Sequence, residues 1–450
     1  MFPFSFQGRI GRVPYALGSL AAFFSQHLAV WAAYRTLKTP LHIDDAMFWI
    51  GPLRTLTMEN IYLPAVILLL ALAYFLVVAW LLAALAFRRA ADANLSEALA
   101  VAAMAPVVQI PVILYLIIAP PREAGTADPI FPRGDVKGYP AAAIGVVAGI
   151  GLTLVAVAVS TLVFRVYGYG LFVVSPFVIG ATTGYFANRK TDVGGGRTAR
   201  LVIAATLLGG VALVLTALEG VVCILLASPL AGGIALVGGM LGRAIALTGK
   251  RSSSQIVPGF ALLPIVFALE HLFAAPTHFD TQQAIAVNAP VERVWNAILH
   301  MDTIDEPLAL PFRLGVAYPI RGDVEGEGVG AVRHGEFSTG VAVERVTEWA
   351  ANRKLAFVVE TDIPAMREMS PYEHVHAPHV VGYFTTSLTS FELERRGDAP
   401  LEVVLRTSHE IRLDPILYWM PMARWMVAAN NARVLAHIKH QAERQRVTAQ

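Results

Sequence analysis

Histidine and carboxylate side chains gather in one short stretch near the end of the chain. Tyr372, His374, His376 and His379 lie close together, with Glu373 among them and with Pro371 and Pro378 before and near the end of the stretch. Imidazole and carboxylate groups bind Zn²⁺ and related ions, but this spacing matches no common zinc motif. We therefore predict no metal and no cofactor. The flanking prolines favour a loop, which we interpret as a lid over a ligand cavity; a plain polar surface loop is the alternative.

A second candidate is His409, which lies in a segment where apolar and polar residues alternate. Side chains of a strand point alternately to opposite faces, so His409 is expected on the buried face. A neutral imidazole there could orient a ligand carbonyl or act as a general base; the alternative is a hydrogen-bonded core histidine. His334 and Glu336 could face the same way and complete an acid–base set.

Four ionisable residues lie near the ends of long apolar segments: Glu219, Arg243, Glu270 and His271. Charged groups are costly in hydrocarbon and often mark transport pathways. At a segment end, however, a long side chain can reach the polar interface. No row of acids and histidines follows one segment, so transport is the weakest of the functions considered. Motifs for a nucleophile elbow, a phosphate loop or a zinc protease are absent.

The elements that carry these residues form two parts of different character. Residues 1–275 contain 18 Lys and Arg against 11 Asp and Glu, whereas residues 276–450 contain 17 against 22. The hydrophobic content of 56% and the mean hydropathy of +0.57 indicate several membrane spans. The acidic second part argues against nucleic acid as a partner. The single cysteine, Cys223, excludes a disulfide within the chain.

Long apolar segments fill the first part. A helix needs about 20 apolar residues to cross the hydrocarbon core. By that measure we predict eight spans, at residues 14–34, 61–87, 98–119, 140–164, 170–187, 200–218, 221–247 and 256–275. Gly145-x-x-x-Gly149 and Gly238-x-x-x-Gly242 predict close helix packing. The distribution of basic residues among the loops does not decide on which side of the membrane the C-terminus lies, because one miscounted span would reverse the assignment.

The first 135 residues also carry a recognisable pattern. They begin with FSFQGRIGRVPYALGSL, continue with Arg88-Arg89-Ala-Ala-Asp92 and close on ADPIFPRGD. This pattern resembles a bacterial inner-membrane family of unknown function, numbered 805, although Ala91 stands where that family usually has histidine. The resemblance implies a location in the bacterial inner membrane and no chemistry. We expect a first membrane domain at 1–135, with about three spans, and a second membrane region at 136–276, with about five.

Residues 277–450 are expected to form one α+β domain. Thr281–Asp302 predicts a strand and then an amphipathic helix. Alternating segments follow at 329–337, 341–349, 354–360, 383–394 and 402–413. A long helix at 421–444 is expected to end the domain. Its apolar stripe comprises Met422, Trp425, Ala428, Ala432, Leu435 and Ile438.

The order of these elements and one motif carry a second resemblance. The segment APVERVWNAI at 289–298 resembles the opening helix of the START-like, or SRPBCC, superfamily, which has the helix-grip fold. The resemblance implies an antiparallel sheet around a long C-terminal helix, with a cavity for an apolar or amphipathic ligand between them. The expected cavity residues are Trp295, Phe357, His409, Trp425 and Leu435. Members include lipid carriers, hormone receptors, cyclases and co-chaperone domains, so fold alone does not choose a function.

The sequence thus predicts a multi-pass membrane protein whose C-terminal domain binds or senses an apolar or lipid-like ligand. Membrane lipids or a small apolar molecule are the expected partners, and the oligomeric state stays open. The short link Ala274–Asp280 would hold the domain close to the bilayer. Two alternatives remain: a cyclase- or hydrolase-like enzyme using His409 with Glu336 or Tyr372, and a protein-interaction or stress-response scaffold.

Overall fold

The computed structural model divides the chain into two compact units: Met1–Leu272 with Ser370–Ala377, and Phe273–Met369 with Pro378–Gln450. The three-part division at 1–135, 136–276 and 277–450 stays a prediction. The structure describes residues 4–6, 8–37, 48–49, 52, 65–95, 99–100, 103, 109–121, 139–248, 257–370, 380–395, 397 and 400–444.

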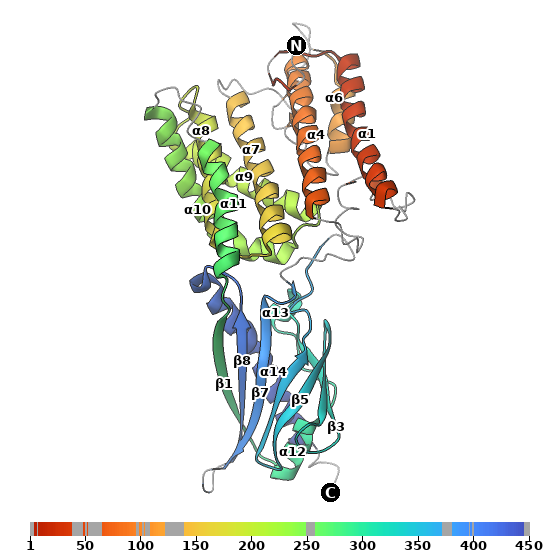
Figure 1. Ribbon diagram of the computed structural model, residues 1–450, viewed down its shortest axis with the longest axis vertical. Coiled ribbons are helices and arrows are strands. Elements are labelled where there is room, and N and C mark those ends of the chain that lie inside the picture. Colours follow the sequence, from red (N-terminus) through yellow and green to blue (C-terminus); the bar gives the residue numbers. More distant parts are fainter. Residues whose placement is uncertain are drawn as a thin grey trace. The chain divides into compact units, whose positions relative to one another are not determined.

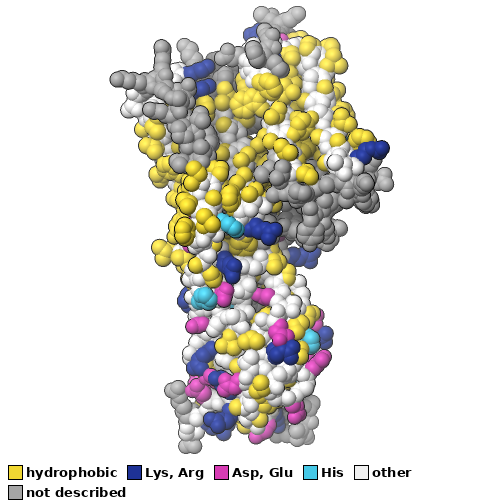
Figure 2. Space-filling view, in the orientation of Figure 1, with side chains coloured by type: hydrophobic (Ala, Val, Ile, Leu, Met, Phe, Trp, Pro, Cys, Tyr) yellow, Lys and Arg dark blue, Asp and Glu magenta, His cyan; other side chains and the backbone are white. Residues whose placement is uncertain are grey.

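The first unit is helical (Figure 1). Its described helices are α1 (Arg12–Leu37), α4 (Ala65–Asp92), α6 (Gln109–Ile118), α7 (Tyr139–Ala158) with the π-helix η1 (Val159–Phe164), η2 (Gly170–Val174) with α8 (Ser175–Asn188), α9 (Gly195–Leu215), α10 (Val221–Thr248) and α11 (Val257–Phe273). Hydrophobic side chains cover much of the surface of this unit in Figure 2. Its apolar helices make the chain an integral membrane protein.

Six described helices are long and apolar enough to cross a membrane. The predicted third and eighth spans coincide with shorter apolar helices, Gln109–Ile118 and Leu263–Phe273. Ten residues of helix are about 15 Å long, roughly half the thickness of the hydrocarbon core. The multi-pass architecture is therefore confirmed at six candidate spans, and the count of eight stays a prediction.

Glycines bring α8 and α10 into backbone contact. A Cβ atom on Gly238 would collide with the carbonyl oxygen of Phe177, and one on Gly242 with that of Ala181. On α7, a Cβ on Gly145 would lie 2.9 Å from the carbonyl oxygen of Thr183. The small-residue spacing thus marks tight helix packing, as the sequence predicts.

The arginine motif of the first 135 residues holds the end of α6. Arg89 is fully buried, and its Nε donates to the carbonyl oxygen of Leu116 at 3.0 Å. It also bonds Asp92 and the carbonyl oxygen of Ala119, to which Arg12 Nε donates at 3.0 Å. The last carbonyls of a helix lack partners within it and carry partial negative charge. The two arginines therefore supply the missing donors.

The second unit is an eight-stranded antiparallel sheet that curves around one long helix (Figure 1). The strands lie in the order β1-β8-β7-β6-β5-β4-β3-β2. They are β1 (Thr277–Val287), β2 (His300–Met301), β3 (Pro319–Glu325), β4 (Val332–Phe337), β5 (Gly340–Ala350), β6 (Lys354–Thr361), β7 (Phe384–Glu394) and β8 (Leu401–Ile411); the helices are α12 (Val291–Leu299), α13 (Leu310–Arg313) and α14 (Ile416–Arg444). This arrangement confirms the helix-grip architecture.

An apolar core fills the end of this unit that carries α12. Val294, Trp295 and Ile298 of α12 are buried there, as the spacing of the helix predicts. They belong to one cluster with Leu355 of β6 and Leu435 of α14. The burial of such apolar side chains supplies most of the favourable free energy of folding.

The long helix α14 differs from its prediction in start and in buried face. It begins at Ile416 rather than 421 and buries Trp419, Ala423, Val427, Asn431, Arg433, Leu435, His437, Ile438 and Ala442. Trp425 is 48% exposed and Ala432 is exposed, so the predicted stripe is wrong at these two positions. Three of the residues that α14 buries, Asn431, Arg433 and His437, are polar and form hydrogen bonds. A hydropathy pattern does not predict the burial of such residues.

Candidate functional site

His409 lies on the inner face of the sheet, toward α14, between two aromatic rings. The centroids of Phe279 and Phe384 lie 5.2 and 5.3 Å from that of the imidazole, with interplanar angles of 30° and 27°. The register pairs His409 with Phe279 on β1 and with Thr386 on β7, so the stack spans three neighbouring strands. His409 is 5% exposed. The alternation of β8 therefore predicts its face correctly.

Both ring nitrogens of His409 contact hydroxyl groups. Nδ1 lies 3.1 Å from Thr386 Oγ1, and Nε2 lies 2.7 Å from Thr407 Oγ1. Thr407 Oγ1 also lies 2.7 Å from Thr281 Oγ1, and Asn431 Nδ2 of α14 donates to both hydroxyls. Burial lowers the pKa of His409 to about 4. The imidazole is thus neutral near pH 7, with both nitrogens engaged in a network that ties β1, β7 and β8 to α14.

A second polar group on the inner face is an ion pair between Arg333 of β4 and Glu344 of β5. Their side chains are 8% and 6% exposed. The Arg333 Cζ lies 4.7 Å from the ring centroid of Phe357, and a Cβ on Gly322 would collide with the guanidinium. Burial raises the pKa of Glu344 in spite of the neighbouring arginine. The missing side chain of Gly322 on β3 therefore leaves the space that the Arg333 guanidinium occupies.

Hydropathy alternation does not reveal this pair, because it treats charged positions as solvent-facing. One sequence signal exists: Arg333 and Glu344 are equally distant from the turn at 338–339, and the register pairs them directly. Oppositely charged residues at matched hairpin positions favour a cross-strand pair.

The structure does not bring His334 and Glu336 to His409. Glu336 forms an ion pair with Arg321, and His334 Nε2 lies 3.9 Å from Glu325 Oε1. The His334 and Glu336 side chains are 39% and 35% exposed, on the outer face of β4. They face outward because their neighbours on β4, including Arg333, take the inner face.

The remaining predicted cavity residues divide between core and surface. Trp295, Phe357 and Leu435 are 8%, 2% and 3% exposed and belong to the apolar core. Trp295 packs edge-on against Trp349 at a centroid distance of 5.6 Å. Trp425 lies on the surface. The predicted lid residues Tyr372, His374, His376 and His379 lie outside the described residues.

Part of the inner face is only half-buried. Gln283, Phe384, Thr386 and Thr389 each pair in register with a buried inner-face residue, yet keep intermediate exposure. Two buried polar atoms on this face, Nε of Arg333 and Oε1 of Gln283, have no hydrogen-bond partner in the described part of the chain. Native proteins leave few such atoms unpaired, so each calls for an explanation.

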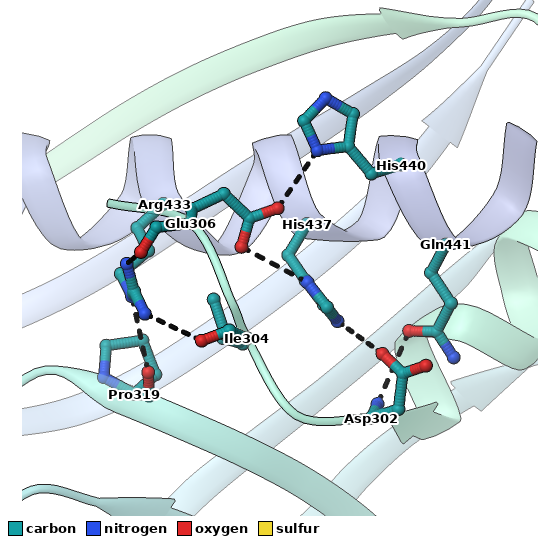
Figure 3. A network of polar contacts seen from close by, with 8 residues as sticks. All are labelled: Asp302, Ile304, Glu306, Pro319, Arg433, His437, His440 and Gln441. Carbon is teal, nitrogen blue, oxygen red and sulfur yellow. Dashed lines mark hydrogen bonds and ion pairs between the residues drawn. The ribbon is translucent and has the colours of Figure 1, made fainter. Parts of the chain in front are cut away.

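A separate network fixes the second half of α14 (Figure 3). His437 lies 2.6 Å from Asp302 Oδ1 and 3.3 Å from Glu306 Oε2, while His440 lies 3.0 Å from Glu306 Oε1. Arg433 donates to the carbonyl oxygen of Ile304 at 2.9 Å. Burial opposes ionisation of Glu306, but its hydrogen bonds and the histidines outweigh this and lower its pKa. Among the described residues, no group of three or more His, Cys, Asp or Glu side chains could hold a metal ion.

Comparison with known proteins bears on both units. Residues 3–127 match a family model described as "Protein of unknown function (DUF805)", which confirms the resemblance stated for the first 135 residues. No curated protein matches the chain.

The second unit matches solved structures. The Aha1 dimer from Colwellia psychrerythraea is 18% identical, with 37% of this chain and 96% of that chain covered and a TM-score of 0.21. Zhui aromatase/cyclase from Streptomyces sp. R1128 is 16% identical, with 38% and 96% covered and a TM-score of 0.22. Truncated norcoclaurine synthase from Thalictrum flavum is 11% identical, with 37% and 94% covered and a TM-score of 0.23. Sequence identities and TM-scores this low do not indicate an activity for this chain. Its fold follows from the strand order and from α14.

Proposed function

We propose that the second unit binds an apolar or lipid-like ligand against the inner face of its sheet, while the helices of the first unit keep it at a membrane. One observation carries the proposal: the inner face is half-buried around Thr389 and contains two buried polar atoms, Nε of Arg333 and Oε1 of Gln283, that have no hydrogen-bond partner among the described residues. A bacterial inner membrane and the eight-span count are the finer parts of the same proposal.

The chemistry of this face suits an amphipathic molecule. An unpaired buried polar group costs about 1–3 kcal/mol, which a ligand's polar end would recover by forming the missing hydrogen bond. The half-buried ring of Phe384 offers apolar surface for the remainder of the ligand. A wholly apolar ligand would leave the polar atoms unpaired, so one polar group on an apolar body is the better match.

The tether adds to the argument. Only three residues separate the end of α11 at Phe273 from the start of β1 at Thr277. A domain held this close to a bilayer meets membrane lipids at a high effective concentration, so weak intrinsic affinity would suffice for occupancy.

An enzyme of the cyclase or hydrolase kind has less support. Its general base would be His409, but both nitrogens of that ring contact threonine hydroxyls, and a pKa of about 4 makes it a weak base at neutral pH. His334 and Glu336 lie on the other face of the sheet. No observation favours the protein-interaction scaffold over ligand binding.

The test compares two substitutions on adjacent residues of β7 that face opposite sides. Thr389 points inward, opposite Thr407 and Phe357, whereas Leu388 points outward and is 38% exposed. Binding of a fluorescent fatty-acyl probe to the full chain in detergent is expected to have a saturable component. Thr389→Trp should abolish that component by filling the inner face, and Leu388→Trp should keep it. Equal binding by both variants, or no saturable binding by the wild type, would refute the proposal.

A further inference from the structure

The antiparallel sheet has two opposite ends, and one of them carries the start of the domain. The register places Thr277, Ile411 and Phe384 side by side across β1, β8 and β7. The end of β6, the start of β5, the end of β4 and the start of β3 lie at the same end. We call the segments at this end, residues 310–319, 338–343, 361–369, 380–384 and 411–417, the entry rim.

Exposed large apolar side chains concentrate at the entry rim. Its members are Leu310, Val341, Met369, Val381 and Leu417. The opposite end of the sheet has one in its described loops, Val329. Single exposed apolar residues are ordinary on a protein surface, but a group of them at one end marks an interaction surface.

The first turns of α14 extend this surface. Leu417 is 87% exposed and Trp425 is 48% exposed, and the spacing of eight residues puts them on one side of the helix. Arg424 is exposed beside Trp425, while Trp419 and Val427 are buried on the opposite side. Tryptophan, leucine and arginine on one exposed helix face are typical of helices that lie at a membrane interface.

The chain connectivity is the argument for the bilayer as the occupant of this surface. The apolar helix α11 ends with Leu272 and Phe273, which are 73% and 77% exposed. Four Cα steps lead from Phe273 to Thr277, a reach of at most about 14 Å at roughly 3.5 Å per residue. Thr277 pairs with Ile411, five residues before α14 begins. The entry rim is thus the end of the domain at which the chain arrives from the last apolar helix.

We propose that the entry rim and the first three turns of α14 rest on the surface of the membrane that the first unit spans, with Leu417 and Trp425 among the lipid headgroups. Arg412, whose side chain is 57% exposed beside Glu410, would face anionic headgroups there. This surface would orient the inner face of the sheet toward its lipid supply, but the contact itself needs no bound ligand and stands apart from the proposed function.

The test measures the depth of nitroxide labels on the full chain in vesicles of phosphatidylethanolamine and phosphatidylglycerol. Cys223→Ala removes the native thiol. Leu417→Cys then places a label on the surface proposed to meet the membrane. Val329→Cys places a matched label at the opposite end, and Ala432→Cys places one about 22 Å further along α14. All three positions are exposed, so labelling should leave the fold intact.

Collision with oxygen, which concentrates in lipid, and with a water-soluble nickel chelate gives the environment of each label. The label at 417 should collide with oxygen several-fold more, and with nickel several-fold less, than the labels at 329 and 432. Water-like collision rates at 417 would overturn the proposal. A label at 417 that neither reagent reaches would indicate packing against protein, and would overturn it equally.

Discussion

The buried ion pair Arg333–Glu344 gives the sharpest prediction about the stability of the second unit. Replacing Arg333 with methionine keeps most of the side-chain volume and removes the charge. Glu344, whose side chain is 6% exposed, then has no counter-ion within the described part of the sheet. Removing one partner of a buried pair costs about 3–5 kcal/mol, because the other charge stays desolvated and unpaired. For a unit of this size, that corresponds to a fall of about 6–20 °C in the unfolding midpoint.

The cost should depend on pH in a defined direction. Burial already raises the pKa of Glu344 above its unfolded value, and loss of Arg333 raises it further. A group with a raised folded-state pKa contributes its full stability below the unfolded pKa of about 4.3, and loses it as pH rises toward the folded value. Arg333→Met should therefore be least destabilising near pH 4 and most destabilising near pH 8.

Hydrogen exchange followed by mass spectrometry measures this in the full chain, because peptides from β4 and β5 report the second unit alone. The double variant Arg333→Met with Glu344→Met is the control, since it leaves no buried charge from this pair. It should recover most of the loss and show no pH dependence from this site. If the single variant unfolds like the wild type, or if the double variant is no better than the single one, our interpretation of the pair is wrong.

Two further predictions concern a titration and a helix contact. Burial lowers the pKa of His409 to about 4, so its contribution to the free energy of unfolding is present above the unfolded pKa of about 6.5. This contribution is lost as pH falls toward 4, at up to about 1.4 kcal/mol per pH unit. His409→Phe keeps an aromatic ring in the stack and should remove this pH dependence from hydrogen exchange measured in β8. In the first unit, the added Cβ of Gly238→Ala would collide with the carbonyl oxygen of Phe177, which should cost about 1–3 kcal/mol or more of stability. The variant should therefore aggregate at a lower temperature than the wild type, as measured by size-exclusion chromatography after heating. Gly233→Ala in the same helix meets nothing within 4 Å and should have no such effect; equal behaviour of the two variants would contradict the packing described here.

Much of the fold could be predicted because most elements obey one simple period. The buried face of α12 and the strands β5 to β8 follow their apolar spacing, and observed bounds differ from prediction by one or two residues. β3 escaped prediction because Gly322 takes an inner position, where its missing side chain makes room for Arg333. Because this inner position of β3 has no side chain and its neighbour is charged, the strand lacks the alternation of apolar and polar residues that would predict it.

The site was harder to predict for the same reason. On β4 the charged Arg333 faces inward and the polar His334 and Glu336 face outward, so apolar alternation cannot choose the face. On α14, the buried Asn431 and His437 have partners far away in sequence, on β8 and after α12. Burial of a polar residue depends on those partners, and only the folded chain brings them together.

The most direct test of ligand binding is photo-crosslinking in the living cell. A benzophenone amino acid in place of Thr389 lies on the inner face, and one in place of Leu388 lies on the outer face of the same strand. After irradiation, mass spectrometry of the β7 peptide should find an adduct with the mass of an acyl-containing molecule at position 389 and none at position 388. No adduct at 389, or equal adducts at both positions, would contradict the account.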